Sequence, residues 1–264
     1  VSATNINITG GTANAGADAS LEAAGNVTAT TEIQLDDNTG ATAGALLVLN
    51  GSAAQTVTGT INGQGDGDGR IQNSNTAATV TFTGSIGATN DIEDIIIDAN
   101  ADTTFKSTVA VTEDFTVAAG TATTTIHGTV TIGDELTIGG TGNTVAVAST
   151  LGAGDTVFTT TNGGTVITDN DGNADVTLTM PSSFTSGTLT LVNDAADDLT
   201  NFADEFAVTD NQLTDYTVQI NGGDNTILEV TASAKSAAAA AAELGVSEDA
   251  AVATQNAATA FQGD

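Results

Sequence analysis

The residues of this chain that could do chemistry are almost all carboxylates. Its 264 residues include 33 Asp and Glu but only three Lys and Arg, for a formal net charge of −30. With a single His and no Cys, a Cys–His pair is excluded, and a Ser–His–Asp triad would have to use His127. His127 falls in an alternating, strand-like run without a Gly-x-Ser-x-Gly turn. We therefore expect it to be an exposed strand residue, and we predict neither catalytic residues nor an enzyme.

Calcium is the ligand that suits this composition best, because hard divalent cations take carboxylate and amide oxygens. One stretch carries such oxygens at alternate positions, as at the start of an EF-hand loop. Its candidate ligands are Asp169, Asp171, Asn173 and Asp175. The stretch departs from the full EF-hand pattern, with Ala174 at the glycine position and Met180 at the position of the last acidic ligand.

Two further acidic sets are candidate calcium ligands. Asp66 and Asp68 flank a single glycine and form a shorter version of the same pattern. The other set occupies equivalent positions of a 21-residue repeat: Glu113, Asp134 and Asp155, with Asp114 and Glu135 beside them. Stacked strands would bring these like charges within about 4.8 Å, which is unfavourable unless water or a cation lies between them. We expect calcium to stabilise the fold, with solvated turn acids as the alternative.

The strands that must position these carboxylates follow a repeat of 21 to 25 residues. Residues 105–117 map onto residues 126–138 with every apolar position matched at a step of 21. The repeat predicts one column of stacked side chains formed by Val57, Phe82, Phe105, Ile126 and Val147. A further step after Val147 gives Leu151, Ala153 and Val157, and one more gives Ala174, Leu178 and Met180. A period in this range with alternating residues is typical of stacked β coils.

Within each coil the inward positions read large, small, large, as in Val57, Gly59 and Ile61. The small residue is expected near a bend or opposite a bulky side chain. The residues between them should form an outward ladder of Thr58, Thr83, Lys106, His127 and Ala148. The pattern predicts an all-β parallel β-helix with coils of 21–25 residues.

Four segments are expected along the chain. Residues 1–50 should form irregular first coils or a cap with short β runs at 5–9, 33–35 and 46–49, and residues 51–181 a regular solenoid with loops at 63–69 and 99–103. Residues 182–231 should form antiparallel capping strands around an acidic loop at 192–201 and a turn at 221–225. Residues 232–264 should be helical, with one helix over 232–244 that ends at Gly245 and a second after Ser247.

Composition excludes several classes of function. Nucleic-acid binding needs a basic footprint, and an anionic membrane surface would repel this chain. No stretch is apolar enough to cross a bilayer as a helix, and without Cys the chain forms no disulfides. Because the sequence begins at Val1 without a signal peptide, we expect a processed chain or one cut from a longer precursor.

Two repeats carry a resemblance to a known family. Residues 47–63 (LVLNGSAAQTVTGTING) and 80–87 (VTFTGSIG) resemble repeats of large bacterial autotransporter-type surface proteins, such as rickettsial surface antigens and β-strand-repeat proteins. Residues 208–218 are similar to the autochaperone end of such a passenger, and the Ala-rich tail resembles the helical connector before the membrane barrel. The resemblance implies a right-handed β-helix that is exported across the outer membrane.

Two classes of function follow. The first is a non-enzymatic extracellular structural protein: a surface coat, a filament subunit, or an adhesin for a host or neighbouring cell. Its partners would include further copies that assemble into a homo-oligomer or homopolymer through β edges or strand exchange. The second is a glycan-binding or glycan-cleaving β-helix of the tailspike or polysaccharide-lyase type. It needs an aromatic and basic groove, which one Tyr, no Trp and three basic residues disfavour.

Overall fold

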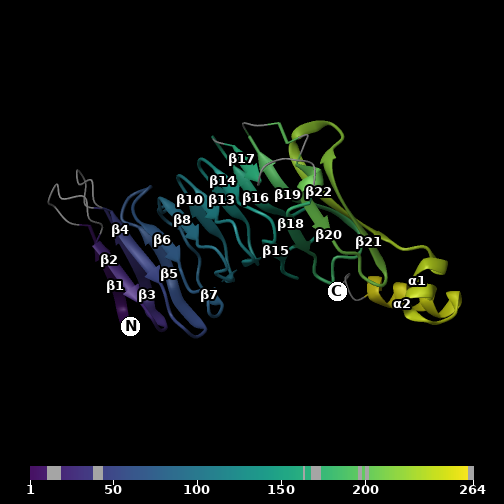
Figure 1. Cartoon of the computed structure of the whole chain (residues 1–264), viewed down its shortest axis with the longest axis horizontal. Coiled ribbons are helices and arrows are strands. Elements are labelled where there is room, and N and C mark those ends of the chain that lie inside the picture. The colour runs from purple at the N-terminus through teal and green to yellow at the C-terminus, as the bar shows by residue number, and fades with distance from the viewer. Residues whose placement is uncertain are drawn as a thin grey trace.

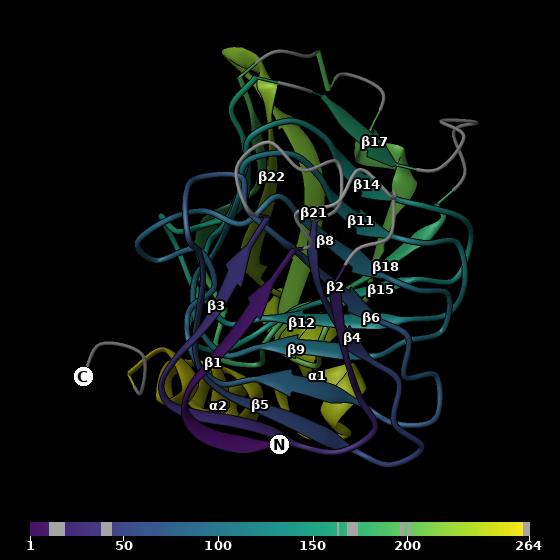
Figure 2. The same cartoon turned by 90° about the vertical axis from the view of Figure 1, so that its left-hand side faces the viewer.

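The structure is a computed structural model that describes residues 1–10, 19–37, 44–162, 164–167, 174–195, 198–199 and 202–260. Strands make up 49% of the chain, and two helices lie at its C-terminal end, as the sequence predicts. The molecule is elongated, with the first strands at one end and α1 and α2 at the other (Figure 1). The strands of the described residues form three sheets around one interior (Figure 2).

The nine-stranded sheet runs the length of the molecule, and all its strands are parallel. In spatial order it contains β1 (Ser2–Thr9), β3 (Val27–Asp36), β5 (Gln55–Gly63), β7 (Val80–Phe82), β9 (Thr103–Phe105), β12 (Thr123–Ile126), β15 (Thr144–Val147), β18 (Val176–Thr179) and β20 (Phe206–Val208).

A seven-stranded sheet, also all parallel, forms a second side. Its members are β2 (Ala19–Ala23), β4 (Ala45–Leu49), β6 (Arg70–Asn73), β8 (Asp94–Ile97), β11 (Phe115–Val117), β14 (Leu136–Ile138) and β17 (Thr165–Ile167). The six-stranded sheet contains β10 (Val109–Val111), β13 (Val130–Ile132), β16 (Thr156–Thr160) and β19 (Gly187–Asp194), followed by the antiparallel pair β22 (Asp224–Ala234) and β21 (Thr214–Asn221).

The predicted column of large side chains is confirmed. Val57 pairs with Phe82, Phe82 with Phe105, Phe105 with Ile126, and Ile126 with Val147, and each is at most 4% exposed. The Phe82 and Phe105 rings are stacked, with centroids 5.2 Å apart. The 21-residue step holds in all three sheets between residues 105–117 and 126–138. Alternating Val, Ile and Phe thus build one continuous buried cluster.

The small inward residue lies at a bend, as expected. Gly59 has φ +111°, and a Cβ atom there would lie 2.5 Å from the carbonyl oxygen of Ala29 in the neighbouring strand. The pairing of β3 with β5 shifts register at this point. A side chain is therefore excluded by both the backbone angle and the close approach of the next strand.

The predicted register is wrong after Val147. Val130 pairs with Phe158, 28 positions later (158 − 130), where the sequence placed Leu151 at a step of 21. Residues 148–155 form two successive turns, closed by N–H donation from Leu151 to Ala148 and from Asp155 to Gly152. These turns insert seven residues before β16 begins. Ala153 is consequently exposed, Leu178 pairs with Val145, and the predicted alignments of Val157, Ala174 and Met180 fail with them.

The ladder prediction is right except for Ala148, which is 9% exposed because it opens this pair of turns. In the N-terminal segment the predicted β runs all lie within strands, and β2 adds one that was not predicted. β3 and β5, of 10 and 9 residues, are the longest parallel strands described, because each continues around the bend without a break.

The C-terminal segment differs from the prediction in strand direction and at two boundaries. β20 and β19 pair in parallel with β18 and β16, and of the described strands only β21 and β22 form the predicted antiparallel strands. β19 continues through Asp194, into the stretch predicted as an acidic loop. The predicted hairpin turn is confirmed between β21 and β22, but β22 extends to Ala234, so the first helix, α1 (Ala237–Leu244), starts later than predicted. Ser236 caps α1, Gly245 ends it with φ +67°, and Ser247 caps α2 (Glu248–Ala260). A short 3₁₀ helix, η1 (Ala203–Glu205), precedes β20.

Candidate functional site

Two columns of carboxylates lie at the N-terminal ends of β8, β11 and β14 in the seven-stranded sheet. Asp94, Asp114 and Glu135 form one column, in which Asp94 Oδ1 accepts the Asp114 N–H at 3.0 Å and Asp114 Oδ1 accepts the Glu135 N–H at 3.0 Å. Glu93 and Glu113 occupy the adjacent positions, joined through their backbones. The stacking of Glu113 with Asp134 and of Asp114 with Glu135 was predicted and is confirmed. Each column carboxylate that accepts a backbone N–H helps to hold the next strand in place.

These carboxylates titrate abnormally where they are crowded. Burial raises the pKa of Asp94, and the Asp114 charge raises it further. Burial and the neighbouring Asp94 charge likewise raise the pKa of Glu93, against the opposite effect of Arg70, whose Nε lies 3.5 Å from the Glu93 carboxylate. Carboxylates with raised pKa values bind protons more readily than isolated ones.

Asp155 does not belong to this column, contrary to the prediction. Its carboxylate accepts the Gly152 N–H at 2.8 Å inside the turn that shifts the register. Asp68 makes the same kind of turn contact with the Gly65 N–H at 2.8 Å, and Asp66 accepts the Asp91 N–H at 3.3 Å. Asp68 and Asp155 therefore organise their own turns, as turn acids do, whereas Asp66 holds the loop of the next coil.

The EF-hand-like stretch is described only at its end. Asp169, Asp171 and Asn173 lie outside the described residues, and Asp175 is 8% exposed at the start of β18. Across the residues that the structure describes, no group of three or more His, Asp and Glu side chains is arranged to hold a metal ion. Calcium binding stays a prediction.

Lys106 and His127 meet on the outward ladder of the nine-stranded sheet. Their Nζ and Nε2 atoms are 2.9 Å apart, and because the ammonium can only donate, the imidazole nitrogen accepts. Desolvation and the Lys106 charge lower the pKa of His127, so the ring is neutral at neutral pH. No carboxylate or hydroxyl is hydrogen bonded to the ring in the described part of the chain, so this His lacks the partners of a catalytic base.

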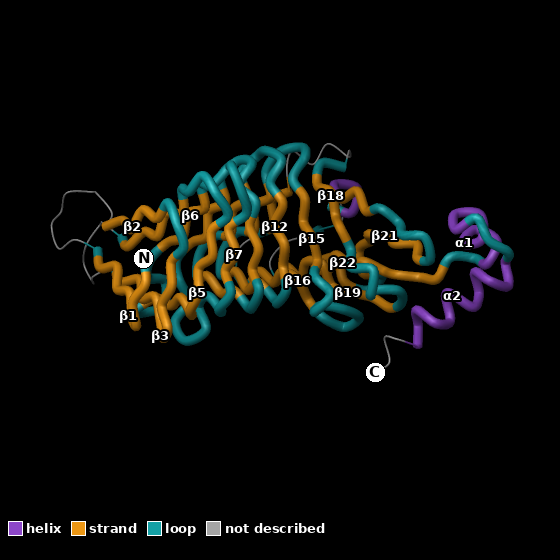
Figure 3. Tube along the Cα trace, turned by 90° about the horizontal axis from the view of Figure 1, so that it is seen from below, coloured by secondary structure: helices purple, strands orange, loops and turns teal. Residues whose placement is uncertain are grey.

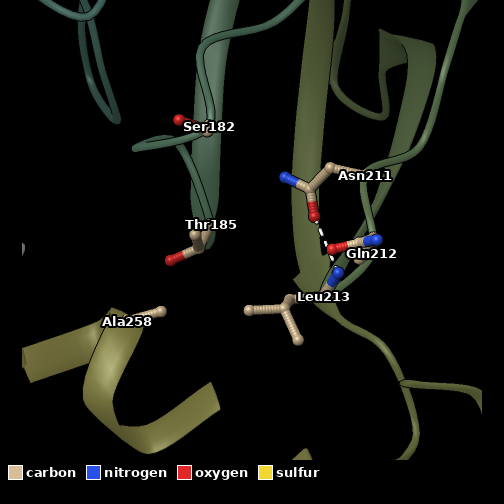
Figure 4. A pocket seen from close by; sticks show the side chains of 6 residues that line it. All are labelled: Ser182, Thr185, Asn211, Gln212, Leu213 and Ala258. Carbon is tan, nitrogen blue, oxygen red and sulfur yellow. Dashed lines mark hydrogen bonds between the residues drawn. The ribbon is translucent and has the colours of Figure 1, made fainter. Parts of the chain in front are cut away.

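A cleft of about 230 Å³ lies where α2 approaches the body of the molecule (Figure 4). Ser182 and Thr185 line one side, Asn211, Gln212 and Leu213 the other, and Ala258 of α2 the third. Asn211 is already engaged, since its Oδ1 accepts the N–H groups of Leu213 and Thr214 at 2.8 Å. The cleft contains no charged side chain, so it offers no acid, base or nucleophile pair.

The sequence did not predict the polar contacts that hold the helical tail. Lys235, at the end of β22, forms ion pairs with Glu243 of α1 and, at 3.7 Å, with Asp215 of β21. Gln255 of α2 donates to the Lys235 carbonyl at 2.8 Å. Glu243 raises the pKa of Lys235 by stabilising its charged form. Lys235 thus ties both helices to the hairpin, and only its position at a strand–helix boundary could have indicated this.

Buried amides are a second feature that the sequence did not predict. Gln55, Asn73, Asn75 and Asn143 are each at most 2% exposed and are hydrogen bonded to the chain at the corners between sheets. Asn143, for example, donates to the carbonyls of Ala118 and Gly139 and accepts the Ala122 N–H. These side chains serve the fold by satisfying backbone groups that the corners leave unpaired.

No helix among the described residues has both the length and the apolar character to cross a membrane. Comparison of the chain with protein-family models, with curated proteins and with solved structures gives no match in any of the three.

Proposed function

We propose that this chain is a non-enzymatic structural protein of a bacterial cell surface, built as a right-handed parallel β-helix. The observation that carries the proposal is the buried column of Val57, Phe82, Phe105, Ile126 and Val147, one residue from each successive strand of the nine-stranded sheet. From Val57 to Val147 each residue of the column pairs with the next at a step of 21 to 25 residues, so the chain winds and stacks. Such a fold provides length and shape from repetition alone.

The chemistry of the described residues supports a structural role over catalysis. The sole His is paired with a lysine, the carboxylate columns bind neighbouring backbone, and the cleft beside α2 is uncharged. The excess of negative charge favours solubility and low non-specific adhesion, both of which suit an exported surface protein.

The glycan-active alternative finds no support in the same residues. Recognition of sugar rings uses exposed aromatic side chains, yet Tyr216 is 7% exposed and its hydroxyl donates to the Phe184 carbonyl at 2.8 Å. Phe82, Phe105, Phe115 and Phe158 are all within the core. We therefore assign the surface to coat, filament or adhesin functions.

Assembly would use the sheet edges. At the N-terminal end β1 and β2 are the last described strands of their sheets, while at the other end the β21–β22 hairpin covers β19. An unpaired parallel edge can accept a strand from another copy or from a neighbouring surface protein.

The test is to label intact cells of the source organism with antibodies against this chain and to image the purified protein by negative-stain electron microscopy. The proposal expects labelling of unpermeabilised cells and rods or filaments in the images. Labelling only after permeabilisation, or compact round particles, would overturn it.

A further inference from the structure

The outward side of β7, β9, β12 and β15 is rich in threonine, and we refer to it as the threonine face. Its central column is formed by Thr81, Thr104 and Thr125, paired strand to strand in the nine-stranded sheet. Figure 3 shows these strands from below, with α1 and α2 beyond the C-terminal end of the sheet. Neither helix therefore covers this face.

The threonine face carries few charges. In a chain of net charge −30, the strands β5, β7, β9, β12, β15, β18 and β20 contain no Asp or Glu. On the outward side of β9, two positions before Thr104 and two after it, lie one acid, Asp102, and one base, Lys106. Around β9 the face thus balances opposite charges, whereas the carboxylate columns elsewhere would repel another copy of the chain.

Its hydroxyl groups also differ from those at the sheet corners. Thr83, Thr129 and Thr150 donate to backbone carbonyls of neighbouring strands at 2.6 to 3.3 Å. Thr81, Thr104 and Thr125 make no side-chain hydrogen bond to any described residue. The central column therefore presents half-buried methyl groups and hydroxyls that stay available to a partner.

Lys106 lacks a carboxylate partner among the described residues. Arg70 pairs with Glu93, and Lys235 pairs with Glu243 and Asp215, but among the described residues Lys106 contacts only the neutral His127. Asp102 uses one carboxylate oxygen to accept the Thr123 N–H at 2.7 Å. Asp102 and Lys106 are four positions apart on an extended strand, which separates their backbones by about 13 Å. They are therefore too far apart to pair with each other.

We propose that two copies of this chain pack threonine face against threonine face about a two-fold axis parallel to the long axis of the sheets. Such an axis above the central column places Thr104 against itself and Lys106 against Asp102 of the partner subunit, and the reverse contact follows by symmetry. Identical, uncharged β surfaces can interdigitate in this way. The inference deepens and rests on the proposed structural function, for which it supplies a lateral contact in addition to the sheet edges.

The chemistry of the face argues against other occupants. A nucleic acid would need a basic surface, and a glycan would need exposed aromatic rings, whereas this face has one exposed lysine and no aromatic side chain pointing outward. A second copy supplies the acid opposite Lys106 and the base opposite Asp102 at once. Overall repulsion between copies is strong, so pairing should be measured at about 0.15 M and at about 1 M salt, where the screening length falls from roughly 8 to 3 Å.

The proposal is tested by reversing the charges at positions 102 and 106 and measuring dimerisation by sedimentation velocity. We expect a monomer–dimer equilibrium for the natural chain. Lys106→Asp and Asp102→Lys should each weaken dimerisation at least tenfold, since each sets like charges against one another twice. The double variant Asp102→Lys/Lys106→Asp should restore it, with circular dichroism to establish that each variant is folded.

A matched pair of variants separates the effect of the threonine face on dimerisation from the effect of net charge. Lys106→Gln and Thr131→Glu both shift the net charge by −1, but Thr131 lies in β13 of the six-stranded sheet, away from the threonine face. Lys106→Gln should weaken the dimer, and Thr131→Glu should leave it as in the natural chain.

A natural chain that stays monomeric at both salt concentrations overturns the inference, as does a dimer indifferent to Lys106→Gln. A double variant that folds but does not dimerise overturns it as well. These outcomes leave the proposed function standing, because surface labelling and rod-shaped particles do not require this contact.

Discussion

The parallel sheets and the C-terminal helices are stabilised by different means. The interior of the sheets is a continuous cluster with four fully buried Phe side chains, while the two helices meet through Ala240, Ala241 and Ala251 with Leu213 and Leu244 beside them. Alanine buries little apolar area, so the helical tail gains little from the hydrophobic effect. Its attachment depends correspondingly more on the Lys235 ion pairs and the Gln255 hydrogen bond. Within one chain, the sheets depend on packing and the tail on polar contacts.

The largest expected effect on stability comes from removing a packed side chain in the interior of the sheets. Phe105→Ala removes a ring that contacts Phe82 at 5.2 Å and Phe115 at 5.7 Å between centroids. We expect a loss of about 3–5 kcal/mol in the free energy of unfolding, measured by urea denaturation. Thr104→Ala on the same strand, but on the outward side, should change it by about 0.5 kcal/mol or less. Equal effects of the two substitutions would contradict the interior position of Phe105.

A smaller effect, confined to α1 and α2, is expected when the charge of Lys235 is removed. Lys235→Met retains the apolar stem of the side chain but removes the charge that holds Glu243 and Asp215. Hydrogen exchange should accelerate several-fold across α1 and α2 and remain unchanged in the parallel sheets. Lys106→Met makes the same chemical change at an exposed site and should leave α1 and α2 protected. If Lys235→Met loosened the sheets as much as the helices, the two regions would not be independent.

The smallest expected effect is a difference in how the stability of the sheets and of the helical tail depends on pH. Because the folded-state pKa values of Asp91, Glu93 and Asp94 are raised above 3.8, 4.5 and 3.8, the folded sheets bind protons more tightly than the unfolded chain. The stabilisation is full below those ordinary values and is lost as pH rises through the raised ones, so the melting temperature should increase as pH falls from 7 toward 4. Lys235 has a raised pKa, so the tail should loosen as pH rises above 10.5. Asp94→Asn should reduce this increase, and a melting temperature that falls over the same pH range would contradict the prediction.

The sequence predicted the part of the fold that depends on alternation. Phe105, Val109 and Phe115 recur 21 positions later as Ile126, Val130 and Leu136, and the strand register follows those matches. The ladder contact of Lys106 with His127 and the stacking of Glu113 with Asp134 follow from the same step. Where the length of the repeat is constant, apolar spacing is sufficient to place both core and surface residues.

Three departures have physical causes that alternation does not contain. Asp155 matched the repeat by residue type, but its carboxylate caps a Gly152 turn that shifts the register. Asp194 suggested a loop, yet it is fully buried in β19, where its carboxylate accepts the Thr165 hydroxyl at 2.7 Å. Ala232 favours a helix by propensity, but it lies in β22, paired with Gly187 and Tyr216. For Asp155 a local turn breaks the repeat, and for Asp194 and Ala232 a long-range contact overrides the local preference.

The corner at residues 148–155 has a consequence for how this molecule can change. Seven additional residues are accommodated there while Ile126 and Val147 keep their pairing on one side and Val130 and Phe158 theirs on the other. A corner that already tolerates a longer excursion is a natural site for grafting a foreign peptide, an epitope tag or a binding loop. Diversity at the surface can thus be gained at one corner without redesign of the interior.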